Sequence, residues 1–234
     1  ITEQDGELTE GGVTFVAPGE EPDRDRLVED LGHVPIAQEF VPGSEHGFYA
    51  LCDDGTPLAS FQHERVRSYN YAGGASVYRR SVRLPGLARE GASLLEHLGW
   101  HGPAMVECKR DARDGSFRLL EVNPRFWGSL ALSVHAGVDF PALYYRLATG
   151  ALDRPVEGYD AGVGCHLLRG EVSYVVSLLR DDADHVERPS LPGELRSILA
   201  SMVRDPNFDY LSLDDPLPFL QDLRAAANLV LGTD

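Results

Sequence analysis

The sequence predicts an α+β fold in which helices flank a mainly antiparallel sheet, followed by a helical C-terminal extension. Two hairpin signals support the sheet, because Asp53-Asp54-Gly55 and the segment 111–115 each separate two apolar strand-like runs. Leucines at helical spacing within residues 87–98 support the flanking helices. The pattern changes beyond Gly150, so we predict an α+β part over residues 1–150 and a mostly helical part over residues 151–234.

Glycines, prolines and acidic residues divide the first half of the chain into short elements. Strands are predicted over residues 11–17, 34–40, 47–52, 57–67 and 81–84. Residues 23–31 are a predicted helix, because charged residues open it and Gly32 stops it. Residues 68–80 are rich in aromatic residues and glycine, and we predict a loop there.

The second half begins with the leucine-rich helix over residues 87–98, which Gly99 ends. Two strands over residues 104–109 and 116–123 then flank the second hairpin turn. One further strand is predicted over residues 162–168. Helices are predicted over residues 129–136, 140–148, 171–180, 193–203 and 216–231, with acidic or proline-containing linkers between the last three.

Composition excludes several classes of partner. The formal net charge of −16 opposes binding to a nucleic-acid backbone. No run approaches the roughly 18 apolar residues that a membrane span needs, and the N-terminal segment does not resemble a secretory signal. Cys52, Cys108 and Cys165 lie far apart, which favours a reducing compartment and no disulfide framework. We therefore expect a cytoplasmic protein, of an oligomeric state that the sequence does not indicate.

The stretch LLEVNPRFWGS, residues 119–129, carries an unusual polar pattern. Side chains alternate between the two faces of a strand, so Glu121, Asn123 and Arg125 are expected on one face. Leu120 and Val122 are expected on the other face. A solvated edge strand is the alternative explanation.

The second hairpin places Glu107 opposite Glu121, with Cβ atoms roughly 4.5–5.5 Å apart. Two carboxylates at this spacing repel unless a proton or cation lies between them. Mg²⁺ prefers such oxygen ligands, and Asn123 offers a neutral oxygen on the same face. Lys109 and Arg125 flank the pair, as a polyphosphate ligand would require. The alternative is a surface ladder of ion pairs, which would contribute little.

These residues resemble a known family. The order E-x-K, turn, L-E-x-N-P-R is similar to the metal-binding core of ATP-grasp ligases, and the run over residues 106–141 resembles the carbamoyl-phosphate-synthase-like or carboxylate–amine ligase subgroup. The resemblance implies an ATP-grasp fold that uses ATP and Mg²⁺ or Mn²⁺. It implies Glu107, Glu121 and Asn123 as metal ligands, and Arg125 and Lys109 as catalytic residues that contact the acyl phosphate and a phosphate.

The segment AQEFVPGSEHGFYAL, residues 37–51, resembles the family's hinge strand. The resemblance implies that Glu39 and the backbone of Phe40 and Val41 contact adenine. It places Glu45 at the ribose, with His46 as the competing register. A strand carboxylate paired with an arginine is the alternative for Glu39.

The segment FQHERVRSYNYAGGASVYRR, residues 61–80, resembles the part of the family that covers the phosphates or the acyl substrate. By period two, His63, Arg65 and Arg67 share a strand face, where each is able to bind a carboxylate or phosphate. A solvated basic face is the alternative. The backbone N–H groups of Gly73 and Gly74, which lie in a glycine pair, are able to approach an anion.

The resemblance implies that a carboxylate is activated as an acyl phosphate and attacked by an amine or similar nucleophile, both small molecules. Two alternatives remain open: an ATP-binding regulatory module without turnover, and a carbamoyl-phosphate or biotin-carboxylase type enzyme that uses bicarbonate. The chain departs from the family pattern because no lysine precedes Lys109. We therefore expect residues 1–150 to be a partial ATP-grasp domain that lacks its N-terminal part, and the fragment alone to be inactive.

Overall fold

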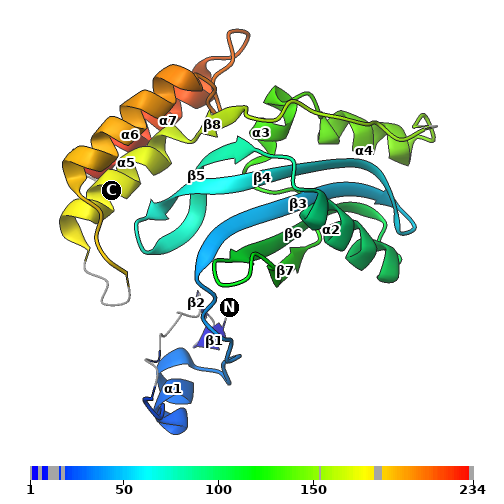
Figure 1. Cartoon of the computed structure of the whole chain (residues 1–234). Coiled ribbons are helices and arrows are strands. Elements are labelled where there is room, and N and C mark those ends of the chain that lie inside the picture. Colours follow the sequence, from blue (N-terminus) through cyan, green and yellow to red (C-terminus); the bar gives the residue numbers. More distant parts are fainter. Residues whose placement is uncertain are drawn as a thin grey trace. The chain divides into compact units, whose positions relative to one another are not determined.

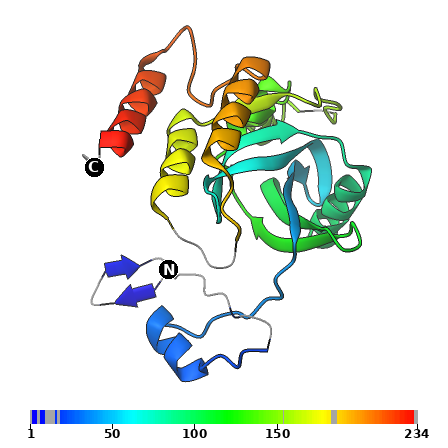
Figure 2. The same cartoon turned by 60° about the vertical axis from the view of Figure 1, so that its left-hand side comes forward.

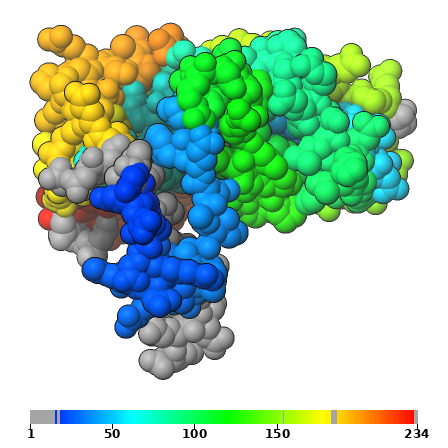
Figure 3. Space-filling model, turned by 60° about the horizontal axis from the view of Figure 1, so that its bottom comes forward, coloured from blue at the N-terminus to red at the C-terminus, as the bar shows by residue number. Residues whose placement is uncertain are grey.

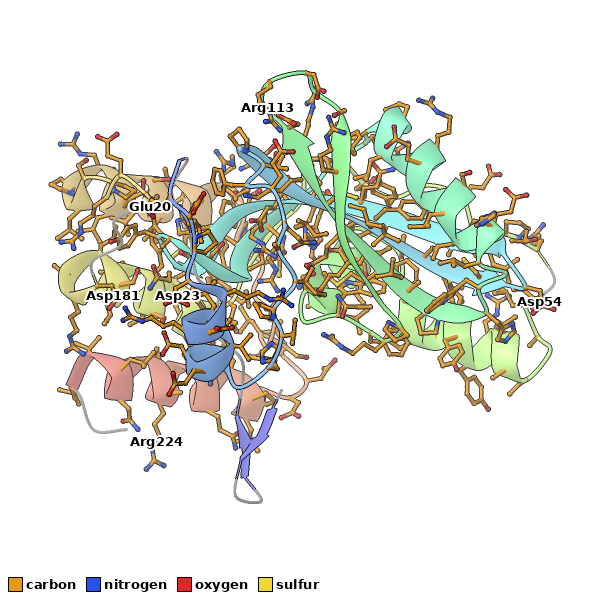
Figure 4. The ribbon with its side chains drawn as sticks, turned by 90° about the horizontal axis from the view of Figure 1, so that it is seen from below. Glu20, Asp23, Asp54, Arg113, Asp181 and Arg224 are labelled. Atoms are coloured by element: carbon orange, nitrogen blue, oxygen red, sulfur yellow. The ribbon has the colours of Figure 1, made fainter. Side chains whose placement is uncertain are left out.

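The computed structural model describes residues 2–4, 7–9, 16, 19–152, 154–181 and 186–231, which belong to two compact units, Ile1–Phe40 and Val41–Asp234. In the first unit, β1 (Thr2–Gln4) and β2 (Glu7–Thr9) pair antiparallel, and α1 (Arg24–Leu31) follows. Asp23, labelled in Figure 4, caps α1 by accepting a hydrogen bond of 3.1 Å from the Arg26 backbone N–H. Gly32 ends it with φ of 70°, so the predicted helix is confirmed.

Two predicted strands of this region have different outcomes. The strand over residues 11–17 lies largely outside the described residues. Residues 34–42 form neither helix nor strand, so the strand predicted over residues 34–40 is wrong. Pro35 and Pro42 have no backbone N–H, which removes two donors that a sheet ladder would need.

The second unit is built on a six-stranded sheet in which every neighbouring pair is antiparallel (Figure 1). The strand order across the sheet is β7-β6-β3-β4-β5-β8. The strands are β3 (Gly43–Asp53), β4 (Thr56–Asn70), β5 (Gly73–Ser81), β6 (Gly102–Asp111), β7 (Phe117–Asn123) and β8 (Gly164–His166). The predicted α+β class with a mainly antiparallel sheet is confirmed.

Both predicted hairpins are present, and their turns explain why the signals were reliable. Asp54 and Gly55 have φ of 44° and 86°, the two positive values that a tight turn between β3 and β4 requires. Between β6 and β7, the Asp111 carboxylate accepts a 2.9 Å hydrogen bond from the Arg113 backbone N–H. Figure 4 shows Asp54 and Arg113 at the two turns.

The region between residues 68 and 84 differs from the prediction. Residues 68–80 are not a loop: β4 runs to Asn70, a two-residue turn follows, and β5 begins at Gly73. The Asn70 side-chain oxygen accepts a 2.9 Å hydrogen bond from the Ala72 backbone N–H and thereby makes this turn. The strand predicted over residues 81–84 is wrong, since β5 ends at Ser81.

Helices cover both faces of the sheet. On one face α2 (Pro85–His97) packs over Phe48, Ala50 and the apolar side of β6. The contact is close: a Cβ added at Gly91 would lie 2.4 Å from a ring carbon of Phe48. On the other face, α3 (Leu130–His135) and α4 (Phe140–Ala148) enclose a second core around Tyr49, Phe61 and Trp127. Figure 3 shows the β6–β7 hairpin, in green, beside α2.

The C-terminal region contains α5 (Leu168–Arg180), α6 (Leu191–Arg204) and α7 (Leu217–Leu231), which lie beside the β5 and β8 edge of the sheet (Figures 1 and 2). The predicted helices are confirmed here, and β8 adds a strand from this region to the sheet. A division at residue 150 stays a prediction. Among the described residues, no helix is long and apolar enough to cross a membrane.

Candidate functional site

The two predicted acidic ligands lie where the hairpin was expected to place them. Glu107 on β6 is the direct partner of Glu121 on β7. On its other side, Glu107 lies opposite Gly47 of β3. Because Gly47 has no side chain, the Tyr49 ring is able to lie over it: a Cβ added at Gly47 would be 2.2 Å from the Tyr49 hydroxyl oxygen.

A bulge between Glu107 and Cys108 changes the alternation of β7. Glu107 pairs with Glu121 and Cys108 pairs with Leu119, so Leu120 is the extra residue. Leu120 is 38% exposed and lines the same small hollow as Glu107. The expectation that Leu120 lies on the opposite apolar face is therefore wrong, whereas Val122 does pack against the α2 core.

A compact charged cluster surrounds Glu107 and consists of Glu45 on β3, Arg65 on β4 and Lys109 on β6. Arg65 makes an ion pair with Glu45 and approaches a Glu107 carboxylate oxygen to 3.6 Å. Lys109 lies 3.9 Å from Glu45 and donates a 3.1 Å hydrogen bond to the Val41 carbonyl. Together with Glu121, the described residues of this region provide three carboxylates and two cations.

The electrostatics of Glu107 reflect this crowding. Burial raises the pKa of the Glu107 carboxyl above its ordinary value. The Arg65 charge lowers that pKa, while the charge of Glu121 and a hydrogen bond shared with it raise it again. Glu121 also accepts a 2.6 Å hydrogen bond from the Asn123 amide. The negative charge of Glu121 thus opposes ionisation of Glu107, and a proton or a cation between the two carboxyl groups would relieve this repulsion.

The donor set fits a hard divalent cation. Two opposed carboxylates and a neighbouring carboxamide provide oxygen ligands, which Mg²⁺ and Mn²⁺ accept. Rotation of the Asn123 amide would turn its oxygen, in place of its N–H, toward the carboxylate pair. Among the described residues, one further cluster has metal-ligand types, formed by Asp53, Asp54 and His101 at the far end of β3, and all three are exposed.

The structure adds a buried hydrogen-bond centre that the sequence patterns did not single out. The Tyr49 hydroxyl and the Ser129 Oγ both contact Nε2 of His63, the latter at 2.7 Å. Trp127 packs on Tyr49 with ring centroids 4.4 Å apart. Burial holds the pKa of His63 well below its ordinary value, and the charges of Arg79 and Arg65 act in the same direction. His63 is thus a neutral link between β4 and the segment after β7.

The expectation that His63, Arg65 and Arg67 share one face is wrong for Arg67. Arg65 lies opposite Arg79, whereas Arg67 lies opposite Tyr78, because the ladder shifts by one residue between them. Consecutive residues of β5 point to opposite faces, so Arg67 points away from Arg65. Its guanidinium is 4% exposed and donates hydrogen bonds of 2.8 Å to both oxygens of Glu171.

The structure also locates the remaining candidates. Arg125 follows the end of β7 and is exposed, so the strand pattern no longer fixes its face. Gly73 and Gly74 begin β5 with φ of 143° and 99°, and the Gly74 carbonyl accepts a 2.7 Å hydrogen bond from Arg65. This bond ties the glycine pair to the charged cluster.

The hinge candidates fall in two places. Glu39 and Phe40 lie in the irregular segment of the first unit and are exposed. Val41 begins the second unit, and its carbonyl contacts Lys109. Of the two register alternatives, Glu45 lies opposite Lys109, on the Glu107 face. His46 lies on the other face, with its ring against Phe117.

Comparison with known proteins gives one family match. A family model described as "ATP-grasp in the biosynthetic pathway with Ter operon" matches residues 34–164, which include the charged cluster and the carboxylate pair. No curated protein sequence matches the chain significantly.

Several solved structures are similar to part of the chain. The N5-carboxyaminoimidazole synthetase from Staphylococcus aureus matches with a TM-score of 0.46 and 12% identity, over 61% of this chain and 40% of that one. The biotin carboxylase–β,γ-ATP complex from Campylobacter jejuni matches with 0.42 and 12%, over 54% and 30%. The biotin carboxylase domain of Hydrogenobacter thermophilus 2-oxoglutarate carboxylase, bound to MgADP and bicarbonate, matches with 0.42 and 16%, over 58% and 33%. The matched part spans 30–40% of the length of these three structures.

Proposed function

The chain belongs to the ATP-grasp family, and from this premise we propose that it is part of an ATP- and Mg²⁺-dependent ligase. The proposed reaction activates a carboxylate as an acyl phosphate, which an amine or similar nucleophile then attacks. The observation that carries the proposal is the direct pairing of Glu107 with Glu121 beside the charged cluster. We propose a cytoplasmic location and small-molecule substrates for it.

In this proposal Glu107, Glu121 and Asn123 hold one or two Mg²⁺ or Mn²⁺ ions. The bound metal would neutralise the negative charge of the β- and γ-phosphates of ATP. The two glutamates favour binding of a cation, because their negative charges repel each other at the register that the hairpin sets. Asn123 orients the second carboxylate through its hydrogen bond of 2.6 Å.

The cations beside the pair have distinct proposed tasks. Arg65 is held by Glu45, Glu107 and the Gly74 carbonyl, so its guanidinium is pre-oriented for an anionic group. Lys109 would contact a phosphate, and exposed Arg125 would stabilise the acyl phosphate or its tetrahedral successor. Arg67, which faces Glu171 in the interior, is no longer a candidate for phosphate binding.

The nucleoside would lie toward the start of the second unit. Glu45 faces the same side of the sheet as Glu107, which supports its proposed contact with the ribose. Glu39 and the backbone of Phe40 and Val41 stay proposals for the adenine contact. A Cβ added at Gly73 would have no neighbouring atom within 4 Å, and one added at Gly74 would lie 3.9 Å from the Tyr69 Cβ. The surroundings of this glycine pair therefore leave space for an anion.

Calorimetric titration of Mg-ATP into the protein tests the nucleotide part of the proposal. We expect binding that Glu121→Gln weakens and that Glu96→Gln, a change of an exposed glutamate on α2, leaves unchanged. Absence of Mg-ATP binding by the full-length protein would contradict the proposal.

ADP release by the full-length protein, measured with a panel of carboxylates, amines and bicarbonate, tests the chemistry. ADP formation that needs one carboxylate and one amine supports the ligase. Binding of Mg-ATP with no ADP release across the panel would support the regulatory module. Turnover that depends on bicarbonate alone would support the carboxylase-type alternative.

A further inference from the structure

Arg79 is a buried cation on the site face of the sheet. It lies on β5 directly opposite Arg65, and it is 1% exposed. Its guanidinium donates a 2.6 Å hydrogen bond to Asp209 and a 3.1 Å hydrogen bond to the Val77 carbonyl. A longer contact of 3.4 Å reaches the Gly128 carbonyl. Arg79 therefore joins β5 to two segments that are distant in the sequence.

Asp209 comes from the segment between α6 and α7, beyond the residues that the family model matches. The segment is fixed along β8, because the Asp209 backbone N–H donates a 2.9 Å hydrogen bond to the His166 carbonyl. The His166 N–H in turn donates a 2.9 Å hydrogen bond to the Asn207 carbonyl. The other Asp209 carboxylate oxygen accepts from Cys165 Sγ at 3.2 Å. The carboxylate thus has a set position.

Electrostatics require that the buried Arg79 guanidinium has an anionic partner. An arginine cannot lose its proton in a protein, so a buried guanidinium needs a counter-charge. Arg65 cannot supply it, since it is a second cation on the neighbouring strand. The Arg79–Asp209 contact is the ion pair that the structure shows for Arg79 in the described part of the chain.

The third partner of Arg79 lies in the segment that directly follows the metal-binding strand. Gly128 stands between Trp127, which packs on Tyr49, and Ser129, which contacts His63 at 2.7 Å. The same segment, residues 124–129, joins Asn123 to α3 and contains Arg125. Its position therefore sets where Arg125 lies and supports the end of β7, where Asn123 pairs with Met105.

We propose that Asp209 is a positioning residue: it holds Arg79, and Arg79 holds residues 124–129 in the place that the metal and acyl-phosphate site needs. The C-terminal region, which contains Asp209, then contributes to the geometry of that site. We call the hold of Asp209 and Arg79 on residues 124–129 the clamp, and it rests on the Arg79 contacts alone. Its effect on the metal site rests also on the proposed function.

Trp127 fluorescence reports on the clamp without any ligand. The chain has two tryptophans, so Trp100→Phe leaves Trp127 as the single tryptophan. In this background we expect Asp209→Asn to increase quenching of Trp127 by acrylamide, because the segment is released. Asp209→Glu should restore much of the protection. Asp214→Asn changes an exposed acid in the same α6–α7 segment as Asp209 and should have no effect.

Mn²⁺ affinity, measured by electron paramagnetic resonance in the same variants, tests the consequence. We expect Asp209→Asn to weaken Mn²⁺ binding about 10-fold, as the loss of outer-shell support does elsewhere. Should Asp209→Asn fail to fold, Arg79→Lys replaces it, because a lysine keeps the charge but cannot reach both acceptors.

Four outcomes separate the two claims. Increased quenching together with weaker Mn²⁺ binding supports the whole inference. Unchanged quenching in Asp209→Asn and Arg79→Lys overturns the clamp. Increased quenching with unchanged Mn²⁺ affinity overturns the link to the site. If the unaltered protein binds no Mn²⁺, the proposed function fails at its metal, while quenching still decides the clamp.

Discussion

Glu107 and Glu121 lie directly opposite each other on antiparallel strands, and Asn123 holds the second carboxylate through a 2.6 Å hydrogen bond. The hairpin that presents them is fixed at its turn by Asp111, so the two acids cannot move apart by a change of register. Their repulsion is therefore built into the fold. A proton or a divalent cation relieves it.

This relationship predicts a stabilising substitution. In metal-free protein at pH 7, Glu121→Gln should raise the free energy of unfolding by about 0.2–1 kcal/mol, because it removes a like charge from an opposed pair. Urea denaturation in the presence of a chelator measures the change. Glu90→Gln, at an exposed position in the middle of α2, is the matched control and should show none. A loss of stability in Glu121→Gln would argue against ionic repulsion at this pair.

The raised pKa of Glu107 predicts a pH dependence of stability. Between the ordinary glutamate pKa of about 4.3 and the raised value, folded Glu107 keeps a proton that the unfolded chain has released. The free energy of unfolding should therefore fall as the pH rises through this window. Denaturation curves from pH 4 to 7 should show a smaller fall in Glu107→Gln than in the unaltered protein; equal slopes would contradict the assignment.

His63 predicts the opposite slope at higher pH. Its pKa is lowered by burial, so below about pH 6.5 the unfolded chain binds a proton that the folded chain does not. The free energy of unfolding should then fall as the pH falls. His63→Gln should flatten this dependence between pH 7 and 5. If the variant and the unaltered protein respond alike, His63 is not the buried neutral group.

The Arg67–Glu171 pair anchors α5 to β4 and makes a prediction about stability. Both side chains are almost fully buried, at 4% and 2% exposure. Glu171→Leu alone should lower the free energy of unfolding by about 3–5 kcal/mol, because buried Arg67 loses both hydrogen-bonded carboxylate oxygens and is left with the Glu194 carboxylate at 3.8 Å. The double variant with Arg67→Leu should recover much of the loss. Additive effects in a double-mutant cycle would show that the two groups do not depend on each other.

The sequence allowed prediction of the parts that rest on local signals. The Asp54-Gly55 turn and the turn after Asp111 set both hairpins, and the second one placed Glu107 opposite Glu121. The strand predicted over residues 34–40 failed, and Pro35 within it removes a backbone donor that a sheet ladder would need. The turn after Asn70 was missed. An Asn whose side chain accepts a hydrogen bond from the backbone N–H two residues later is a recognisable turn signal.

Other features depend on contacts that local patterns do not contain. A one-residue shift in the β4–β5 ladder sends Arg67 to the opposite face from Arg65, and a bulge in β7 brings Leu120 to the site face. Arg79 and Asp209 meet across 130 residues of sequence. Such pairs become visible only when the strands have been placed, so period-two reasoning described the hairpins well and the site incompletely.

Direct titration with Mn²⁺, followed by electron paramagnetic resonance, tests the central claim that Glu107 and Glu121 share a divalent cation. The account predicts saturable binding that Glu107→Gln and Glu121→Gln each weaken by more than about 10-fold, while Glu96→Gln binds as the unaltered protein does. Equal Mn²⁺ affinity in all four proteins would contradict it.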